Sequence, residues 1–290
     1  MGEFAWKALG TLWNVIVDNS ELDIDTRQKI LDCTEDFEDR FSRFRPESEV
    51  NALRNAQGGT YTVSDEFSIL LNRADRMRVL TQGAYDPAVA LLLEEVGYNR
   101  GYTLQSSGNE QDFVLPIWSL EENALTVNGP VVFDLGGMGK GYWIDRVAQI
   151  IQDSGYNYFI VEGGGDMYGT SKADGSSWRV AIEYPGRPDT AASVVELNHQ
   201  GVAVSDTFRK RWGKWNHLID PHAKKSIERV IGAAAVSPSA WEADCMTSIL
   251  FLSDPQYYEK AAREFQAQYL VINADGSVIL SPQWAGEIFA

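Results

Sequence analysis

The stretch Asp134-Leu-Gly-Gly-Met-Gly-Lys-Gly-Tyr142 joins two different sequence patterns. The β-branched run Val131 to Phe133 before it predicts a short strand, and Met138 to Asp153, which overlaps its end, predicts a helix. A strand that turns into a helix points backbone N–H groups at one place, which suits an anion such as phosphate. A tight turn without a ligand explains the same glycines, so the stretch by itself leaves both interpretations open.

The spacing within this stretch excludes two common phosphate-binding motifs. A Walker loop, GxxxxGK[ST], would need Gly at position 134 and Ser or Thr at position 141, where this chain has Asp134 and Gly141. The dinucleotide motif GxGxxG is not satisfied either.

Two long helices are predicted in the first third of the chain, after an early strand at Leu12 to Val17. The first, Glu21 to Arg43, has Leu31 and Phe41 among its apolar positions. The second, Ser64 to Gln82, begins with Ser64 as its N-cap, and its apolar face is supplied mostly by Phe67, Leu70, Leu71, Ala74, Met77 and Val79.

Beyond residue 100 the sequence changes to short β-prone runs separated by Gly, Asn and Asp, which predicts a largely antiparallel sheet. These runs are Val114 to Trp118, Leu125 to Val127, Val131 to Phe133, Tyr158 to Val161, Trp178 to Ile182, Val194 to Leu197 and Val230 to Val236. A further helix is predicted at Ala240 to Leu252. Because helices and strands do not alternate regularly, the fold class is α+β rather than a doubly wound parallel sheet.

Composition places the chain among ordinary globular proteins. It has 290 residues, of which 44% are hydrophobic and 23% charged, and a net charge of −16. That charge repels a polyanion, so nucleic acid is not expected as a partner. No 18-residue apolar run predicts a transmembrane segment. Without a repeat or a linker, residues 1–290 are expected to form a single domain.

Cysteine and histidine usage limits the metal chemistry. Cys33 and Cys245 are too few for a disulfide framework or a CxxC site, so two inert, buried thiols are expected. With three histidines and no HExxH motif, any metal should be a hard cation bound through oxygen. Neither a secretory signal nor a lipobox cysteine is visible in this chain, which leaves the compartment open.

A possible metal site lies in the predicted helix Ala240 to Leu252. Ser239 and Glu242 fit a capping box, which places Asp244 and Ser248 four residues apart on one face. A carboxylate and a hydroxyl that face the same point suit Mg²⁺. The alternative is an ordinary aspartate that interacts with the helix dipole.

Three further motifs carry candidate residues. In Trp215-Asn-His-Leu-Ile-Asp-Pro221, His217 could act as a general base, although a single histidine at a strand end is also a common structural group. In Gly83-Ala-Tyr-Asp-Pro87, Asp86 fits an N-cap for a helix at Ala88 to Val96. Glu162-Gly-Gly-Gly-Asp166 fits a turn, a bulge or a close backbone approach.

Taken in order along the chain, these motifs resemble the ApbE-type flavin transferases, which are FAD:protein FMN transferases. The resemblance runs through Leu9-Gly-Thr-Leu-Trp13, Phe41-Ser-Arg-Phe-Arg-Pro-Glu-Ser-Glu49, Gly83 to Pro87, Asp134 to Tyr142, Gly164 to Asp166, His217 to Pro221, and Ala243-Asp244 with the hydroxyls after it. Each motif is short, but seven in register are specific.

The resemblance implies an α+β fold related to the T-fold and a Mg²⁺-dependent enzyme. Such an enzyme moves FMN from FAD to a Thr or Ser hydroxyl of an acceptor protein and releases AMP. By position, the flavin and its diphosphate would contact Phe44, Ala84, Tyr85, Asp86, Gly136, Tyr142 and Ile219. The metal would be held by Gly139, Asp244 and Ser248, with Thr247 as a neighbouring hydroxyl that could take the place of Ser248. His217 would be the base.

The chain departs from the family pattern at Val204-Ser-Asp-Thr-Phe208, at Asp220-Pro-His-Ala-Lys224, and at Arg54, where Asn is common. Two alternatives stay open. One is an FAD diphosphatase that uses the same site with water as the nucleophile and releases FMN and AMP. The other, which the departure at Val204 to Phe208 motivates, is a non-catalytic protein that binds FAD intact.

Overall fold

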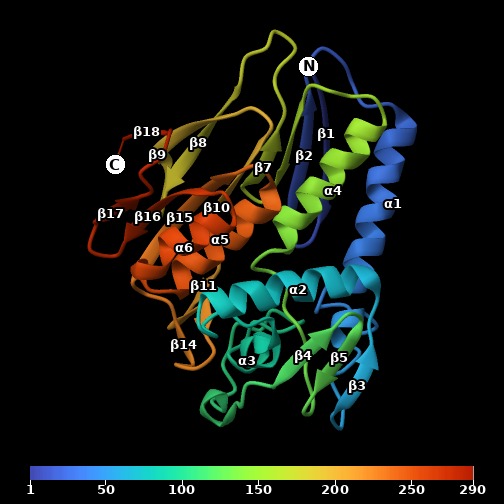
Figure 1. Ribbon diagram of the computed structural model, residues 1–290, viewed down its shortest axis with the longest axis vertical. Coiled ribbons are helices and arrows are strands. Elements are labelled where there is room, and N and C mark those ends of the chain that lie inside the picture. The colour runs from blue at the N-terminus through green and yellow to red at the C-terminus, as the bar shows by residue number, and fades with distance from the viewer. Residues whose placement is uncertain (290) are drawn as a thin grey trace.

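Eight strands form a central sheet in the computed structural model, which describes residues 1–289 (Figure 1). Every strand pair in it is antiparallel. Their order is β1 (Gly2–Ala8), β2 (Thr11–Val17), β6 (Phe159–Gly163), β7 (Asp166–Gly169), β10 (Gln200–Asp206), β15 (Val230–Ser237), β16 (Gln268–Asn273) and β17 (Val278–Leu280).

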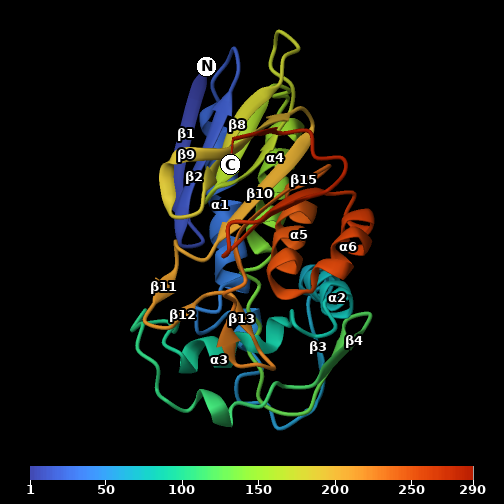
Figure 2. The ribbon, with the colours of Figure 1, turned by 90° about the vertical axis from the view of Figure 1, so that its left-hand side faces the viewer.

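Four helices cover one face of this sheet (Figures 1 and 2). They are α1 (Ile24–Phe41), α4 (Gly139–Asp153), α5 (Ala240–Leu252) and α6 (Tyr258–Glu264). The side chain of Asp23 caps α1 and that of Ser239 caps α5, because each accepts a hydrogen bond from a backbone N–H of the first turn. The core between helices and sheet contains Trp13, Ile144, Ile151, Phe159 and Ile249, all fully buried.

The opposite face of the central sheet packs against a smaller sheet in the order β18 (Glu287–Ile288), β9 (Arg187–Leu197) and β8 (Trp178–Tyr184). The two sheets share a second core that includes Ile160, Val180, Ile182, Leu197 and Val202. The central sheet is therefore apolar on both faces.

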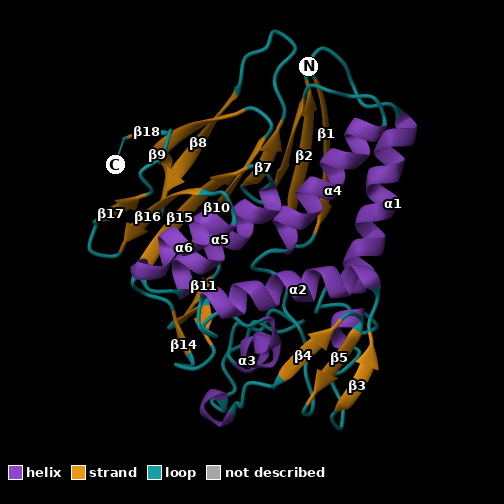
Figure 3. Ribbon diagram, in the orientation of Figure 1, coloured by secondary structure: helices purple, strands orange, loops and turns teal. Residues whose placement is uncertain are grey.

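A smaller group of elements lies at one end of the molecule, next to α2 (Asp65–Leu80) (Figure 3). It contains α3 (Ala90–Glu95) and a sheet in the order β3 (Gly59–Thr62), β5 (Ala124–Val127) and β4 (Trp118–Glu121). It also contains the short hairpins β11 (Arg211–Trp212) with β12 (Trp215–Asn216), and β13 (Ile219–Asp220) with β14 (Lys225–Ser226).

Helices α4 and α5 cap each other. The Gly141 N–H in the first turn of α4 donates to Asp244 Oδ2 of α5 at 2.9 Å. In return, Asp145 of α4 accepts from the N–H groups of Ala240 and Trp241 at 2.9 and 3.0 Å. Each carboxylate accepts a hydrogen bond from the first turn of the other helix, where the N–H groups have no partner within their own helix. This exchange fixes the position of Asp244.

Glycines allow the two helices to approach this closely. A Cβ on Gly141 would lie 2.3 Å from the Ala240 carbonyl oxygen, and one on Gly201 of β10 would lie 2.3 Å from the Ala240 nitrogen. Real Cβ atoms do not occur at such distances from backbone atoms. The start of α5 is thus held between a glycine of α4 and a glycine of the sheet.

The α+β class and the largely antiparallel sheet are confirmed, and so are the predicted helices, with small shifts at their ends. Asp86 is also an N-cap, since it accepts from the Ala88 N–H. The helix after it begins as a 3₁₀ turn at Pro87–Val89 before α3. Ser64 caps α2 as predicted. No helix within residues 1–289 combines the length and the apolar character that a bilayer crossing requires.

Two predicted strands are wrong. Val114 to Ile117 runs without a strand partner up to β4, and Pro116 in this run has no N–H to give to a ladder. Val131 to Phe133 is buried but not a strand, because Val131 and Phe133 donate to the carbonyls of Leu53 and Val50 in a turn region.

Two apolar helix positions and one of the thiols predicted to be buried are exposed to solvent. Leu31 is 36% exposed and Val79 is 66% exposed, since each lies beside the buried stripe of its helix rather than in it. Cys33 is partly exposed, whereas Cys245 is buried, and both thiols are free.

The close approach at Gly141 gives a stability prediction. Gly141→Ala should lower the free energy of unfolding by about 1–3 kcal/mol, because the new methyl group meets a backbone carbonyl that cannot rotate away. Chemical denaturation with urea measures this.

Gly129→Ala is the matched control, since nothing lies within 4 Å of a Cβ at that position. Its effect should stay within about 0.5 kcal/mol. A Gly141→Ala protein as stable as the control would show that the α4–α5 contact is loose.

Candidate active site

A cavity of about 560 Å³ opens where the first turn of α4 meets α5, the end of α1 and the smaller group of elements next to α2. The chain segments in its wall lie far apart in the sequence. Its wall includes most of the residues singled out from the sequence, namely Phe44, Ala84, Tyr85, Asp86, Gly136, Gly139, His217, Ile219, Asp244 and Ser248. Asp244 and His217 therefore face one cavity.

Tyr142 and Thr247 are the two predicted site residues that do not line this cavity. The Tyr142 hydroxyl donates to Glu66 Oε1 at 2.7 Å, and its ring packs edge-on against Trp241. The Thr247 hydroxyl is fully buried and donates to the Asp244 carbonyl at 2.9 Å. Of the two neighbouring hydroxyls, Ser248 is the one that reaches the cavity.

One end of the cavity is rich in oxygen atoms. Asp244 and Ser248 face it from α5, and the Ser248 hydroxyl donates to the Gly137 carbonyl at 2.7 Å. The turn at Gly137 is packed so tightly that a Cβ there would lie 2.8 Å from Ser248 Oγ and 3.1 Å from the Tyr85 ring. This end has a fixed shape before any ligand arrives.

Lys140 neutralises two buried carboxylates at this end. Its ammonium group is in contact with Asp166 Oδ2 and lies 3.6 Å from Asp244 Oδ1. Although burial opposes its charge, Asp166 and Asp244 raise the pKa of Lys140, so it stays protonated. Burial raises the pKa of Asp244, while Lys140 and the Gly141 N–H oppose that rise.

These groups fit a hard cation better than a transition metal. No cluster of three or more His, Cys, Asp or Glu side chains able to hold a metal occurs in the described part of the chain. The donors present are one carboxylate, one hydroxyl and backbone carbonyls, all of them oxygen. Mg²⁺ accepts such a partial set, because it usually keeps water and substrate oxygens in its shell.

His217 lies between β12 and β13 and lines the same cavity as Asp244 and Ser248 of α5. Its backbone N–H donates to the Lys210 carbonyl at 3.3 Å, while its buried Nδ1 has no hydrogen-bond partner. Burial, with the positive charge of Lys210, lowers the pKa of His217 to about 4. The imidazole is therefore neutral near pH 7 and able to accept a proton.

The other end of the cavity is lined by rings and apolar side chains. Phe44, Tyr98 and Tyr102 form an aromatic cluster there, next to Leu93 and Ile219. In the wall beyond this cluster, burial raises the pKa of Asp86, whose carboxylate also accepts from the Trp118 indole N–H at 2.9 Å. The Tyr85 hydroxyl is buried without a partner.

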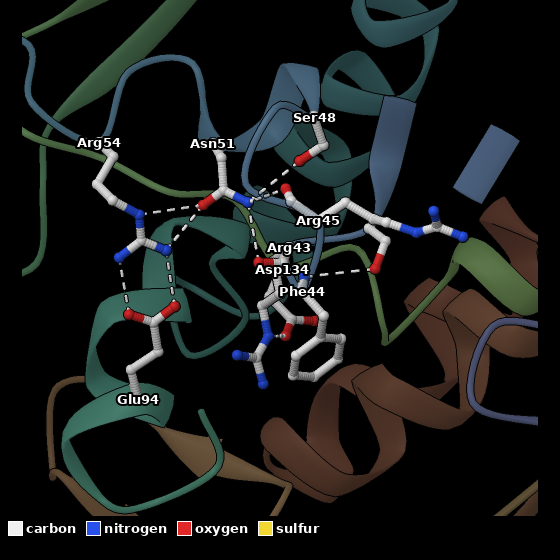
Figure 4. Close-up of polar contacts among 9 residues, drawn as sticks. Arg43, Phe44, Arg45, Ser48, Asn51, Arg54, Glu94 and Asp134 are labelled. Carbon is white, nitrogen blue, oxygen red and sulfur yellow. Dashed lines mark hydrogen bonds and ion pairs between the residues drawn. The ribbon is translucent and has the colours of Figure 1, made fainter. Parts of the chain in front are cut away.

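A polar network fixes the segment that carries Phe44 (Figure 4). The Asn51 side chain donates to the carbonyls of Arg43 and Arg45 at 2.8 and 2.9 Å. Arg54 donates to Asn51 and forms a two-pronged ion pair with Glu94, with both N···O distances 2.8 Å. Arg54, where the chain departs from the family pattern, thus makes a structural contact and does not line the cavity.

Several residues in or next to the cavity received no role from the sequence. Lys140 and Asp166 lie inside quoted motifs, but only the fold brings the Lys140 ammonium group to the carboxylates of Asp166 and Asp244. Arg43 pairs with Asp134 at 2.5 Å, and Lys210 follows a strand that the sequence pattern did not reveal. For Lys140, the available signal was a single positive charge inside a glycine-rich stretch of a chain with net charge −16.

The chain matches the protein-family model described as ApbE family over residues 9–272. It is also similar to curated proteins named FAD:protein FMN transferase. The one from Escherichia coli strain K12 is 24% identical over 303 aligned positions, which cover 96% of this chain and 86% of that protein. The one from Haemophilus influenzae is 26% identical, with 94% and 87% covered.

Solved structures show the same fold. The flavin transferase ApbE from Vibrio cholerae has a TM-score of 0.82 at 23% identity, covering 97% of this chain and 96% of that one. The ApbE protein of Thermotoga maritima has a TM-score of 0.84 at 24% identity, with the same coverage. The α+β architecture inferred from the sequence is therefore shared with these proteins.

The α+β scaffold, the cavity with an oxygen-rich end and a ring-lined end, and these relatives define an enzyme of the flavin transferase class. The chain belongs to the ApbE family, whose model spans most of its length. The family expected from the sequence motifs is confirmed.

The Lys140 contacts give a pH-dependent stability prediction. Lys140→Met leaves two buried carboxylates without their cation and should lower the free energy of unfolding by roughly 3–5 kcal/mol at pH 7. Without Lys140 the pKa of Asp244 rises further, so protonation relieves part of the cost as the pH falls. Urea denaturation should show the variant recovering stability relative to wild type between pH 7 and pH 5.

Lys210→Met is the control, because Lys210 lines the same cavity without a carboxylate ion pair among residues 1–289. Burial and the nearby Lys140 lower the pKa of Lys210, so its removal should cost little at either pH. Equal losses in both variants would mean that the Asp166 and Asp244 contacts add nothing to stability.

Proposed function

We propose that this enzyme transfers FMN from FAD to a Thr or Ser hydroxyl of an acceptor protein, with Mg²⁺, and releases AMP. The observation that carries the proposal is one cavity that joins an oxygen-rich end on α4 and α5, a neutral imidazole and a ring-lined end. FAD has the matching parts, a diphosphate and flat rings. The names of the relatives support flavin transfer as the reaction class.

The oxygen-rich end would hold the metal and the diphosphate. Asp244, the Ser248 hydroxyl and the Gly139 carbonyl are the groups we assign to Mg²⁺. When bound there, Mg²⁺ neutralises negative charge on the phosphate oxygens. Lys140 keeps Asp244 ionised and in place, and the Gly141 N–H in the first turn of α4 holds the same carboxylate.

His217 would serve as the general base. In the transfer step the acceptor hydroxyl oxygen forms a bond to the phosphorus on the FMN side, and the bond to the bridging oxygen breaks, so that AMP leaves. The hydroxyl proton passes to His217, whose buried Nδ1 has no partner and whose pKa near 4 keeps the ring neutral. The ring-lined end, including Phe44, Ala84, Tyr85 and Ile219, would orient the flavin.

Asp244→Asn tests the metal assignment. Purified enzyme, FAD, Mg²⁺ and an acceptor protein with a suitable Thr should yield protein-bound FMN and AMP, detected by mass spectrometry. The variant should abolish the yield, because a neutral amide is a poor ligand for Mg²⁺.

Asp145→Asn is the matched control, a partly buried carboxylate on the partner helix that caps α5 outside the cavity. It should retain turnover. If wild type releases FMN and AMP at the same rate without acceptor, the enzyme is an FAD diphosphatase. Unchanged FAD in the presence of acceptor would favour a flavin-binding protein.

His217→Gln tests the base. We expect kcat to fall about 10²–10⁴-fold, the usual contribution of a positioned base, while the Kd for FAD changes little. In wild type saturated with FAD and Mg²⁺, which favours ionised Asp244, kcat should hold from pH 8 to pH 5 and fall only as the pH drops toward 4, where His217 becomes protonated. A loss centred near pH 6.5, or full activity in the variant, would contradict this role.

A further inference from the structure

The Phe44 ring has one face occupied by an anchored cation. The Arg43 guanidinium carbon lies 4.2 Å from the centre of the ring, and Asp134 holds the Arg43 side chain from behind. The backbone on either side is fixed by the Asn51 contacts (Figure 4). Phe44 is therefore a rigid wall of the cavity, with one face left for a partner.

Tyr102 occupies that other face. Its ring stacks on Phe44 with centroids 5.1 Å apart and planes inclined by 22°. A guanidinium group 4.2 Å above the ring centre leaves no room for a second ring on its side, so Tyr102 must lie opposite Arg43. The Tyr102 hydroxyl lies 3.7 Å from the position that a Cβ on Gly10 would take. The tyrosine thus extends across the cavity from Phe44 to the β1–β2 turn.

Tyr102 is held less firmly than the wall it covers. It is 49% exposed and belongs to residues 100–109, all of which are exposed. Its backbone has φ +46°, a left-handed conformation that is unfavourable for a residue with a Cβ. A side chain in a costly conformation on an exposed loop can leave more easily than one fixed by a buried network.

In the proposed function, the isoalloxazine ring of the flavin lies against Phe44. We propose that Tyr102 occupies the seat of this ring in the free protein, on the face of Phe44 opposite Arg43, and competes with the ring for it. The inference rests on the proposed function, since it concerns the same cavity. A flat aromatic ligand gains a stack on Phe44 but must first displace the stack made by Tyr102. Tyr102 therefore sets the affinity of the enzyme for flavin.

The test is a gain of affinity, which general damage to the protein does not produce. Tyr102→Ala should bind riboflavin, which has the ring but no diphosphate, about 2–10-fold more tightly than wild type, the range that a stacked aromatic pair is worth. Tyr102→Phe keeps the stack and should bind like wild type. Quenching of flavin fluorescence measures each Kd.

Leu104→Ala is the matched control for a loosened loop. Leu104 lies on the same loop, is 43% exposed and has φ +51°, but does not line the cavity. Its riboflavin affinity should equal that of wild type. A gain in Leu104→Ala equal to that in Tyr102→Ala would assign the effect to loop flexibility and overturn the proposal.

Three further outcomes separate a failure of this inference from a failure of the proposed function. If wild type binds riboflavin and Tyr102→Ala binds it no more tightly, the inference is wrong while the proposed function stands. If Tyr102→Ala gains affinity for ADP but not for riboflavin, the seat takes adenine and the inference is also wrong. Wild type that binds neither FAD nor riboflavin overturns the proposed function, and this inference with it.

Discussion

The exchange of caps between α4 and α5 is the constraint on which the site depends. Asp145 satisfies the start of α5, and Asp244 satisfies an N–H at the start of α4. Neither helix can shift along the other without leaving buried N–H groups unpaired, which costs about 1–3 kcal/mol for each group. Asp244 is therefore both a structural acceptor and the carboxylate offered to the cavity.

Charge is balanced in the cavity, although the chain as a whole is acidic. The net charge of the chain is −16, yet the cavity wall has five basic side chains, Arg43, Arg45, Lys140, Arg209 and Lys210, and five acidic ones, Glu38, Asp86, Asp134, Asp206 and Asp244. An anionic ligand therefore meets less repulsion in the cavity than the net charge of the protein alone implies. Part of this positive charge is balanced by Asp134 and Asp166, so the cavity remains stable without a ligand.

Local sequence signals predicted the helices well, because caps such as Ser64 and Ser239 and the apolar spacing act within a few residues. The same reasoning paired Asp244 with Ser248, which do face one cavity. It failed for Val114 to Trp118, where Pro116 blocks pairing, and it gave no role to Lys140 or Arg43. Lys140 pairs with Asp166, and Arg43 pairs with Asp134. Each partner lies in a different motif of the sequence, and only tertiary packing brings the two charges together.

The pairing of β2 with β6 has a consequence for the order in which the protein folds. Trp13 to Val17 finds its partner only at Phe159 to Gly163, after α1, α2, α3, the three-stranded sheet of β3, β5 and β4, and α4 have been synthesised. The β1–β2 hairpin must therefore wait with the edge of β2 uncovered, and such long-range pairing is slow. The early helices, whose backbone hydrogen bonds are local, are the segments able to gain structure during that wait.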